Sequence, residues 1–429
     1  MGDIKVIVKV LLVVASFSLS KTGTAQEFDQ YFENKTLRLD YIFGGNKENQ
    51  FIFLDELASY PEWAGRTNRL NELPLKGNGQ IRVVEFASNA LIYLHSFSSL
   101  FQEWLSTEEA STATKSFENV FLVPFPKQKV KIEIVLFDKY GNEKVTLSHI
   151  VDPQDILIHQ KGVQIESEYV YIHKAKKGLN AINVALLAEG FQEHEMDKFM
   201  KAAEVAVVEI FKHEPFGEFK DHFNFIAVKS FSKDSGVSVP HNGEWKSTAI
   251  NSHFDTFYST RYLTTSRIKK MHDILAGIPY EHIIVLANTD VYGGGGIYNS
   301  YTLTTTGNKQ FKPVVVHEFG HSFAGLADEY FYEGGALNEF ISLETEPWEK
   351  NITTLVDFDS KWKQLLNKKT AIPTDRSQAN KNPIGVYQVL PGVGIYVSEL
   401  DCRMKTNQAE VFCKVCQNAI DRLVRFYAD

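Results

Sequence analysis

The chain carries the string HEFGH at residues 317–321, and these residue types at this spacing suit zinc chemistry. On a helix, residues four apart lie on one face, so His317 and His321 can direct imidazole nitrogens toward one point. Zn²⁺ accepts neutral imidazole nitrogens at about 2.0–2.1 Å in tetrahedral sites. Glu318 would lie beside the metal without binding it, where it can accept a proton from water. The string therefore predicts one catalytic zinc ion with Glu318 as the general base.

A catalytic zinc also needs a third protein ligand and an open position for water. After the string the chain continues with SFAGLADEY. Gly325 allows the helix to end in a left-handed turn that returns the chain toward the metal. Asp328, three residues after that glycine, is the predicted third ligand. Glu329 is the alternative, because carboxylate oxygens of either residue are suitable zinc ligands.

The string must lie on a helix, and its neighbours favour one. Pro313 suits a first helical turn, and the valines at 314–316 suit a helix that is buried behind a cleft. From residue 180 onward the pattern alternates between strands and helices. We expect strands at 183–187, 223–228 and 282–287, and helices at 193–212 and 266–276. This alternation predicts an α/β layer.

The first part of the chain has a different pattern. Short alternating or apolar runs between residues 28 and 158 are separated by polar turns, which predicts an antiparallel β-sandwich. No catalytic cluster is evident there, so a structural or docking module is expected. The predicted fold class is α+β. Its parts are a signal peptide at 1–25, a β-sandwich accessory domain at 26–160 and a catalytic domain at 161–429.

The first 25 residues have the features of an export signal. Lys5 and Lys9 precede an apolar run at 10–17 that is too short for a stable membrane span, and small residues follow at 22–25. The expected location is periplasmic, cell-surface or extracellular, with an uncleaved anchor as the alternative. No other segment has the roughly 20 apolar residues that a transmembrane anchor needs.

Charge excludes some partners. The formal net charge is −8, the sequence pI is about 5.9, and no dense basic block is present. Nucleic acid and anionic membranes are therefore poor partners. The 44% of apolar residues is sufficient for a sizeable core.

Residues 317–330, HEFGHSFAGLADEY, resemble the igalysins, the metallopeptidase family named for its immunoglobulin A peptidase, within the metzincin clan. Metzincins have the longer motif HExxHxxGxxH or HExxHxxGxxD, and here Gly325 and Asp328 each fall one place late. The likeness extends from about residue 180 to the C-terminus, and the preceding sandwich resembles the domain that accompanies this family. The resemblance implies a metzincin-like fold and a zinc endopeptidase acting on proteins or peptides, but not immunoglobulin A as the substrate.

The resemblance also implies a methionine below the zinc in a tight turn, and Met404 fits that place. In metzincins the strand before the active-site helix is an edge strand that pairs with the substrate, a place held here by 293–305. Thr406 stands where many metzincins have a tyrosine, so the sequence indicates no oxyanion donor. In another clan, the gluzincins, the third ligand is a later glutamate. The candidates for that arrangement are Glu339, Glu344 and Glu346.

The three cysteines, Cys402, Cys413 and Cys416, all lie near the C-terminus. Together with Met404 they are similar to the archaemetzincins, which use four cysteines for a second, structural zinc. Three cysteines cannot form a four-thiolate site. In an oxidising compartment we expect one disulfide, between Cys402 and either Cys413 or Cys416. A redox-active pair lacks the surrounding thioredoxin-like pattern.

The predicted function is a secreted zinc endopeptidase. The alternative is a non-catalytic protein that binds host proteins or glycans and has a structural or vestigial zinc site, which the aromatic-rich N-terminal region motivates. Glu318 argues against this alternative, because a structural zinc needs no general base. The physiological substrate, the cleavage preference and the oligomeric state are not indicated by the sequence.

Overall fold

The computed structural model describes residues 25–330, 341–381 and 383–428. Nearly all of the predicted signal peptide, residues 1–24, and the alternative ligand Glu339 lie outside the described residues.

The N-terminal part consists of two four-stranded sheets that share one hydrophobic core. One sheet has the order β5-β1-β2-β8 and the other β4-β3-β6-β7, and all pairs are antiparallel except β2 with β8. Their bounds are β1 (Phe32–Gly45), β2 (Gln50–Tyr60), β3 (Gly79–Glu85), β4 (Leu91–Phe97), β5 (Lys115–Pro126), β6 (Val130–Phe137), β7 (Glu143–Val151) and β8 (His159–Gln160). Alternate residues of β1, Leu37 to Phe43, face this core.

The opposite face of β1 is also buried, against the second part of the molecule. Arg38 lies on this face between Asp40 of the same strand and Asp273. Tyr60 of β2 donates a hydrogen bond to the backbone O of His272, 3.0 Å away. Polar residues in the middle of a strand are therefore explained by an interface between the two parts rather than by solvent.

The second part is built on a six-stranded sheet with the order β13-β14-β12-β10-β11-β9. The central strands run parallel, and β9 and β13 are antiparallel at the edges. The strands are β9 (Tyr169–His173), β10 (Ile182–Glu189), β11 (Phe223–Val228), β12 (His282–Ala287), β13 (Gly294–Ile297) and β14 (Tyr301–Thr305). β10 and β12 are buried along their whole length, as central parallel strands should be.

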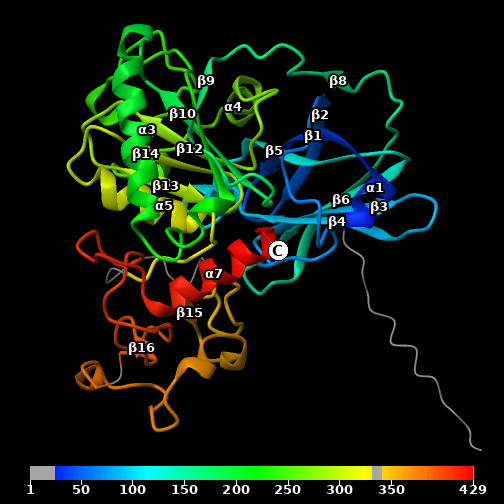
Figure 1. Ribbon diagram of the computed structural model, residues 1–429. Coiled ribbons are helices and arrows are strands. Elements are labelled where there is room, and N and C mark those ends of the chain that lie inside the picture. Colours follow the sequence, from blue (N-terminus) through cyan, green and yellow to red (C-terminus); the bar gives the residue numbers. More distant parts are fainter. Residues whose placement is uncertain (1–24, 331–340, 382, 429) are drawn as a thin grey trace, which may run out of the picture.

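Helices and the other sheet cover both faces of this sheet. Ile182, Val184 and Leu186 pack on one face against α3 (Met196–Phe211), α5 (Phe311–Ser322) and α7 (Lys414–Ala428). Ala185 and Leu187 face α4 (Ile268–Ile274) and the N-terminal sheet on the other side. Figure 1 shows the two parts side by side, with the C-terminal segments and α7 below them.

Shorter elements complete the fold. They are α1 (Ala25–Tyr31), α2 (Leu100–Trp104) and a three-stranded sheet of β15 (Ile352–Thr353), β16 (Tyr387–Gln388) and β17 (Tyr396–Val397). In the part of the chain that the structure describes, none of the helices has the length and apolar character that crossing a membrane requires.

The predicted α+β class is confirmed. The strands expected at 223–228 and 282–287 have those bounds in the structure. The helix expected at 193–212 begins with a 3₁₀ turn at Glu193–Glu195 before α3, and the helix expected at 266–276 is the shorter α4. Helix ends are the least certain part of such predictions because capping and fraying decide them.

Candidate metal centre and active-site cleft

Helix α5 carries the HEFGH residues and holds them at the edge of the six-stranded sheet. Its apolar residues Val315, Val316 and Phe319 join the core beneath the sheet. This packing leaves His317, Glu318 and His321 to line a cleft of about 1000 Å³. Pro313 occupies the first turn of the helix, where its missing N–H costs no hydrogen bond.

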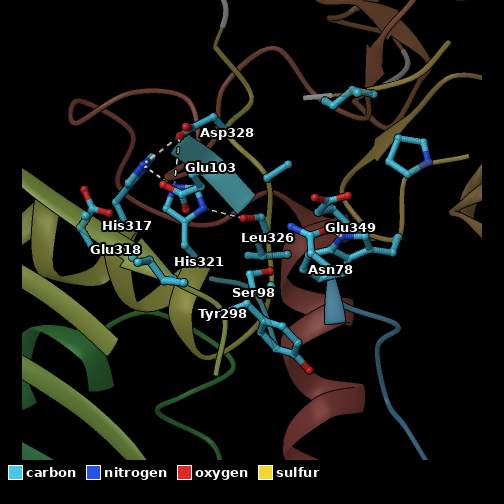
Figure 2. A pocket seen from close by; sticks show the side chains of 18 of the residues that line it. Asn78, Ser98, Glu103, Tyr298, His317, Glu318, His321, Leu326, Asp328 and Glu349 are labelled. Atoms are coloured by element: carbon cyan, nitrogen blue, oxygen red, sulfur yellow. Dashed lines mark hydrogen bonds and ion pairs between the residues drawn. The ribbon is translucent and has the colours of Figure 1, made fainter. Parts of the chain in front are cut away.

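The two histidines and Asp328 converge on one point. The Nε2 atoms of His317 and His321 are 3.1 Å apart. Asp328 Oδ1 lies 3.1 Å from the first Nε2 and 3.2 Å from the second. Figure 2 shows the carboxylate of Asp328 facing both rings. Among the described residues these three form one of two groups of donor atoms close enough together to hold a metal ion.

Backbone carbonyls fix the tautomer of each ring. His317 Nδ1 lies 2.9 Å from the carbonyl O of Arg403, and His321 Nδ1 lies 2.5 Å from that of Leu326. A carbonyl can only accept, so each Nδ1 carries the proton and donates it. In the neutral ring each Nε2 is then left with a lone pair, which is the arrangement that metal-binding histidines need.

The spacing of the three atoms fits zinc. In a tetrahedral site with bonds of about 2.0–2.1 Å, neighbouring ligand atoms are about 3.3 Å apart. The observed separations of 3.1–3.2 Å are close to that distance. Asp328 Oδ1 is buried and has no hydrogen-bond donor once both Nε2 atoms are unprotonated. A cation at the centre would satisfy all three atoms, so the residues present fit a zinc ion.

The turn after α5 brings Asp328 to this place. Gly325 has a φ of +57°, the left-handed conformation expected for it, and its N–H donates to the backbone O of His321. Glu329, the alternative ligand, points away from the histidines into a separate buried cluster. Glu346 lies 3.6 Å from Lys361 Nζ, and neither it nor Glu344 joins the histidines in a donor group.

Charge around the centre shifts several pKa values in the metal-free protein. Burial alone would raise the pKa of Asp328, but the two imidazoles hold it well below its ordinary value. Burial lowers the pKa of His321, yet the Asp328 carboxylate outweighs it and raises that pKa to about 9. Burial raises the pKa of Glu318, which the histidines partly oppose. A raised pKa suits a carboxylate that must take and return a proton.

The four glycines before the helix allow close approach rather than a flexible loop. A Cβ on Gly294 would lie 2.8 Å from Glu318 Oε1. One on Gly296 would overlap the backbone O of Glu318 and lie 2.9 Å from the Cβ of His321. Strand β13 therefore packs directly against the face of α5 that carries Glu318 and His321, which side chains would prevent.

β13 is the expected edge strand, but its outer edge is already paired in part. The N–H of Gly294 donates to Arg261 O at 3.4 Å, and Leu263 N–H donates to Gly294 O at 3.5 Å. At Gly294 the segment 261–263 already occupies the outer edge, so the predicted pairing with substrate has only the rest of the strand available.

Met404 lies below the centre, in a tight turn closed by hydrogen bonds from the N–H groups of Lys405 and Thr406 to Cys402 O. It is fully buried, and its sulfur lies so close to Gly320 of α5 that a Cβ there would be 2.7 Å away. Tyr330 stacks over the His317 ring, with the ring centroids 6.2 Å apart, and lines the cleft.

The expected disulfide is not formed. Cys402, Cys413 and Cys416 are free and buried, and the sulfurs of Cys402 and Cys416 are 3.8 Å apart, against about 2.05 Å in a disulfide. The three sulfurs gather around Glu329 instead. The pairing predicted from compartment and cysteine count is therefore not present, because these sulfurs lie beyond S–S bonding distance.

The N-terminal part contributes to the cleft, which the sequence did not indicate. Glu103 of α2 reaches the cleft and accepts a hydrogen bond from Tyr262 Oη. Burial raises the pKa of Glu103 to about 7. Asn78 and Ser98 also line the cleft (Figure 2). No sequence signal distinguishes one glutamate in a short amphipathic helix, so only the packing of the two parts could reveal it.

Comparison with known protein families gives two matches. Residues 170–389, just over half of the chain, match the family described as IgA Peptidase M64. Residues 27–148 match the family described as Peptidase M64 N-terminus. A search of curated proteins finds no match. The first match begins in β9 and includes the cluster at 317–328, and the second covers β1 to β6 and most of β7.

Proposed function

The chain belongs to the IgA peptidase M64 family and is thus a metallopeptidase-type enzyme, and from that premise we propose that it is a zinc-dependent endopeptidase with Glu318 as its general base. The observation that carries the proposal is the convergence of two Nε2 lone pairs and one carboxylate oxygen, 3.1–3.2 Å apart, beside a partly buried glutamate in an open cleft.

His317, His321 and Asp328 would hold the ion. When bound, it would act as a Lewis acid toward the scissile carbonyl and the attacking water. The hydrogen bonds from both Nδ1 atoms to backbone carbonyls keep the rings oriented and make the ring nitrogens more basic. Three protein ligands are one fewer than a tetrahedral zinc site holds, so they would leave room for water, as a catalytic site requires.

Glu318 performs the proton transfers. Its carboxylate lies against Gly294 at the cleft wall, next to but not among the three donor atoms. From there it takes a proton from the attacking water and returns it to the leaving amine. Its partly buried position raises its proton affinity, so the same group can serve as base and then as acid.

The cleft suits a polymeric substrate. Its lining comes from both parts of the molecule, with Lys76 and Tyr140 from the N-terminal part and Tyr292 and Lys405 from the second part. An extended peptide bound in this cleft would contact the same lining as Glu318. We also propose that the chain is exported, on the basis of the charged and apolar pattern of residues 1–25.

The test is cleavage of casein and of an unbiased peptide library. Internal peptide bonds should be cleaved, cleavage should stop with a zinc chelator such as 1,10-phenanthroline, and added Zn²⁺ should restore it. Chelator-insensitive cleavage would exclude the metal mechanism. If no substrate is cleaved by zinc-loaded protein, the non-catalytic binding function takes its place.

A further inference from the structure

A second cluster of donor atoms lies behind the first. Cys402, Cys413, Cys416 and Glu329 are all buried, and one donor atom of each lies within 4.8 Å of the others. Glu329 follows the proposed zinc ligand Asp328 directly, and the cysteines flank the Met404 turn and the start of α7. All three cysteines lie beyond residue 389, where the family match ends.

The distances in this cluster fit a tetrahedral metal site. With metal–sulfur bonds of about 2.3 Å, neighbouring sulfurs would be about 3.8 Å apart. The Cys402 and Cys416 sulfurs are 3.8 Å apart. Glu329 Oε1 lies 3.1 Å from Cys416 Sγ and 3.7 Å from Cys413 Sγ, which brackets the sulfur–oxygen edge of about 3.5 Å that such a site would have.

Backbone N–H groups point at two of the three sulfurs. Cys402 Sγ accepts hydrogen bonds from the backbone N–H groups of Met404 and Cys413, at 3.4 and 3.2 Å. Cys413 Sγ accepts one from the N–H of Cys416, at 3.4 Å, in the first turn of α7. Backbone donors and a helix N-terminus favour thiolates over thiols.

Glu329 points to the same conclusion. Its side chain is completely buried, and Oε2 has no hydrogen-bond partner in the structure. Its Oε1 accepts from Asn351 Nδ2 at 3.0 Å, which orients the carboxylate toward the sulfurs. A buried carboxylate with an unpaired oxygen beside three thiols is unfavourable, but a cation among them would compensate the charge of all four groups.

We propose that Cys402, Cys413, Cys416 and Glu329 bind a second, structural metal ion, and that this ion is Zn²⁺. Three sulfurs and one oxygen favour zinc over calcium or magnesium, which take oxygen ligands. On binding, each thiol releases its proton to solvent and no oxidant is needed. All four positions are filled by buried protein ligands, so the site has no open position for a substrate.

The position of this second metal site connects it to the first site, at His317, His321 and Asp328. It would join the segment carrying Asp328, the turn carrying Met404 and the first turn of α7 at one point. The N–H of Glu329 already donates to Met404 O at 2.9 Å. Arg403, which lies between Cys402 and Met404 in the chain, supplies the backbone carbonyl that orients His317. The second ion would thus hold in place the segments that position the ligands of the catalytic ion.

The decisive measurement is the metal content of the purified full-length chain after saturation with Zn²⁺ and desalting. We expect two zinc ions per chain, and one in the variant His317→Ala/His321→Ala. X-ray absorption at the zinc edge of that variant should show sulfur neighbours at about 2.3 Å. This variant lacks the proposed catalytic centre, so the result is independent of peptidase activity.

A Cys416→Ser variant gives the reciprocal comparison. It should lose the sulfur-bound ion while the ion at the histidines stays. If this variant fails to fold, absorption spectra of the unmodified chain still decide, because its two ions together should show both sulfur and nitrogen neighbours. A single zinc without sulfur neighbours, or a disulfide among these cysteines found by mass spectrometry of the native protein, would overturn the proposal.

Discussion

Asp328 and Glu329 are neighbours in the chain but belong to two clusters that differ in access to solvent. The cluster of His317, His321 and Asp328 lines a large cleft and has three donors, one fewer than a tetrahedral zinc site holds. The cluster around Glu329 has four donors, all buried. Two acidic residues in succession thus point into two different environments.

The difference teaches that donor type and access together separate a reactive centre from a supporting one. Imidazole and carboxylate with an open position suit a Lewis acid for hydrolysis. Thiolates in a closed site suit an ion that stabilises the fold. The first centre has a glutamate, Glu318, beside it that is not one of its donor atoms and can carry protons. The following experiments test this contrast.

The largest effect is expected at Glu318. Glu318→Gln keeps the size of the side chain but removes the base, so kcat should fall by about 10²–10⁴-fold. The zinc content should not change, because Glu318 is not among the donor atoms. Peptide cleavage and metal content measured on the same sample check this. Loss of zinc together with activity would show that Glu318 is a ligand.

Substitutions of the neighbouring residues Asp328 and Glu329 compare the two clusters most directly. Asp328→Asn should weaken zinc binding at the open centre more than about tenfold and reduce activity accordingly. Glu329→Gln should leave that centre loaded but lower the melting temperature, because it removes a ligand of the closed site. Titration with a zinc indicator and thermal unfolding measure both.

The direction of the change in melting temperature of Glu329→Gln is informative. Without a metal, Glu329→Gln would replace a buried, partly unpaired carboxylate by a neutral amide, and stability would stay the same or rise. A higher melting temperature for this variant would therefore remove the distinction between the two clusters.

A moderate effect is expected where β13 meets α5. Gly296→Ala would place a Cβ against the backbone O of Glu318 and the His321 side chain, so the helix must shift. Overpacking of this kind costs about 1–3 kcal/mol of the free energy of unfolding, and it should also weaken zinc binding. Gly44→Ala in β1 is the control, because its Cβ would meet Lys115 O at an ordinary 3.4 Å. Equal costs for both variants would contradict the role of Gly296.

The smallest effect concerns Glu103 in metal-free protein. Burial raises the pKa of Glu103 from 4.5 to about 7, so folding favours its neutral form. Its stabilising contribution is complete below pH 4.5 and is lost as the pH rises through about 7. Between pH 5 and 8 the unmodified chain should lose about 2 kcal/mol more stability than Glu103→Gln. Denaturant unfolding at both pH values tests this. If both proteins lose the same free energy of unfolding between pH 5 and 8, Glu103 is in a solvated environment.

Much of the fold was readable from the sequence because its periodicities are strong. The apolar runs at 223–228 and 282–287 are continuous, as buried parallel strands require, and both formed strands with those bounds. The expected left-handed turn at Gly325 is present, since few other residues adopt that conformation without strain. Glu103 and the pairing of β13 with 261–263 were not predictable, because both depend on contacts between distant segments.

Local spacing alone determined the pair of imidazoles at 317 and 321, because a helix places residues four apart on one face whatever surrounds it. It also favoured two neighbouring carboxylates, Asp328 and Glu329, as the third ligand, with the later glutamates left as the alternative of another clan. Only the tertiary structure decided between them, directing Asp328 to the histidines and Glu329 to the cysteines. The physical reason is that the direction of a side chain after a turn depends on how distant segments pack around it, and here those segments are the Met404 turn and α7.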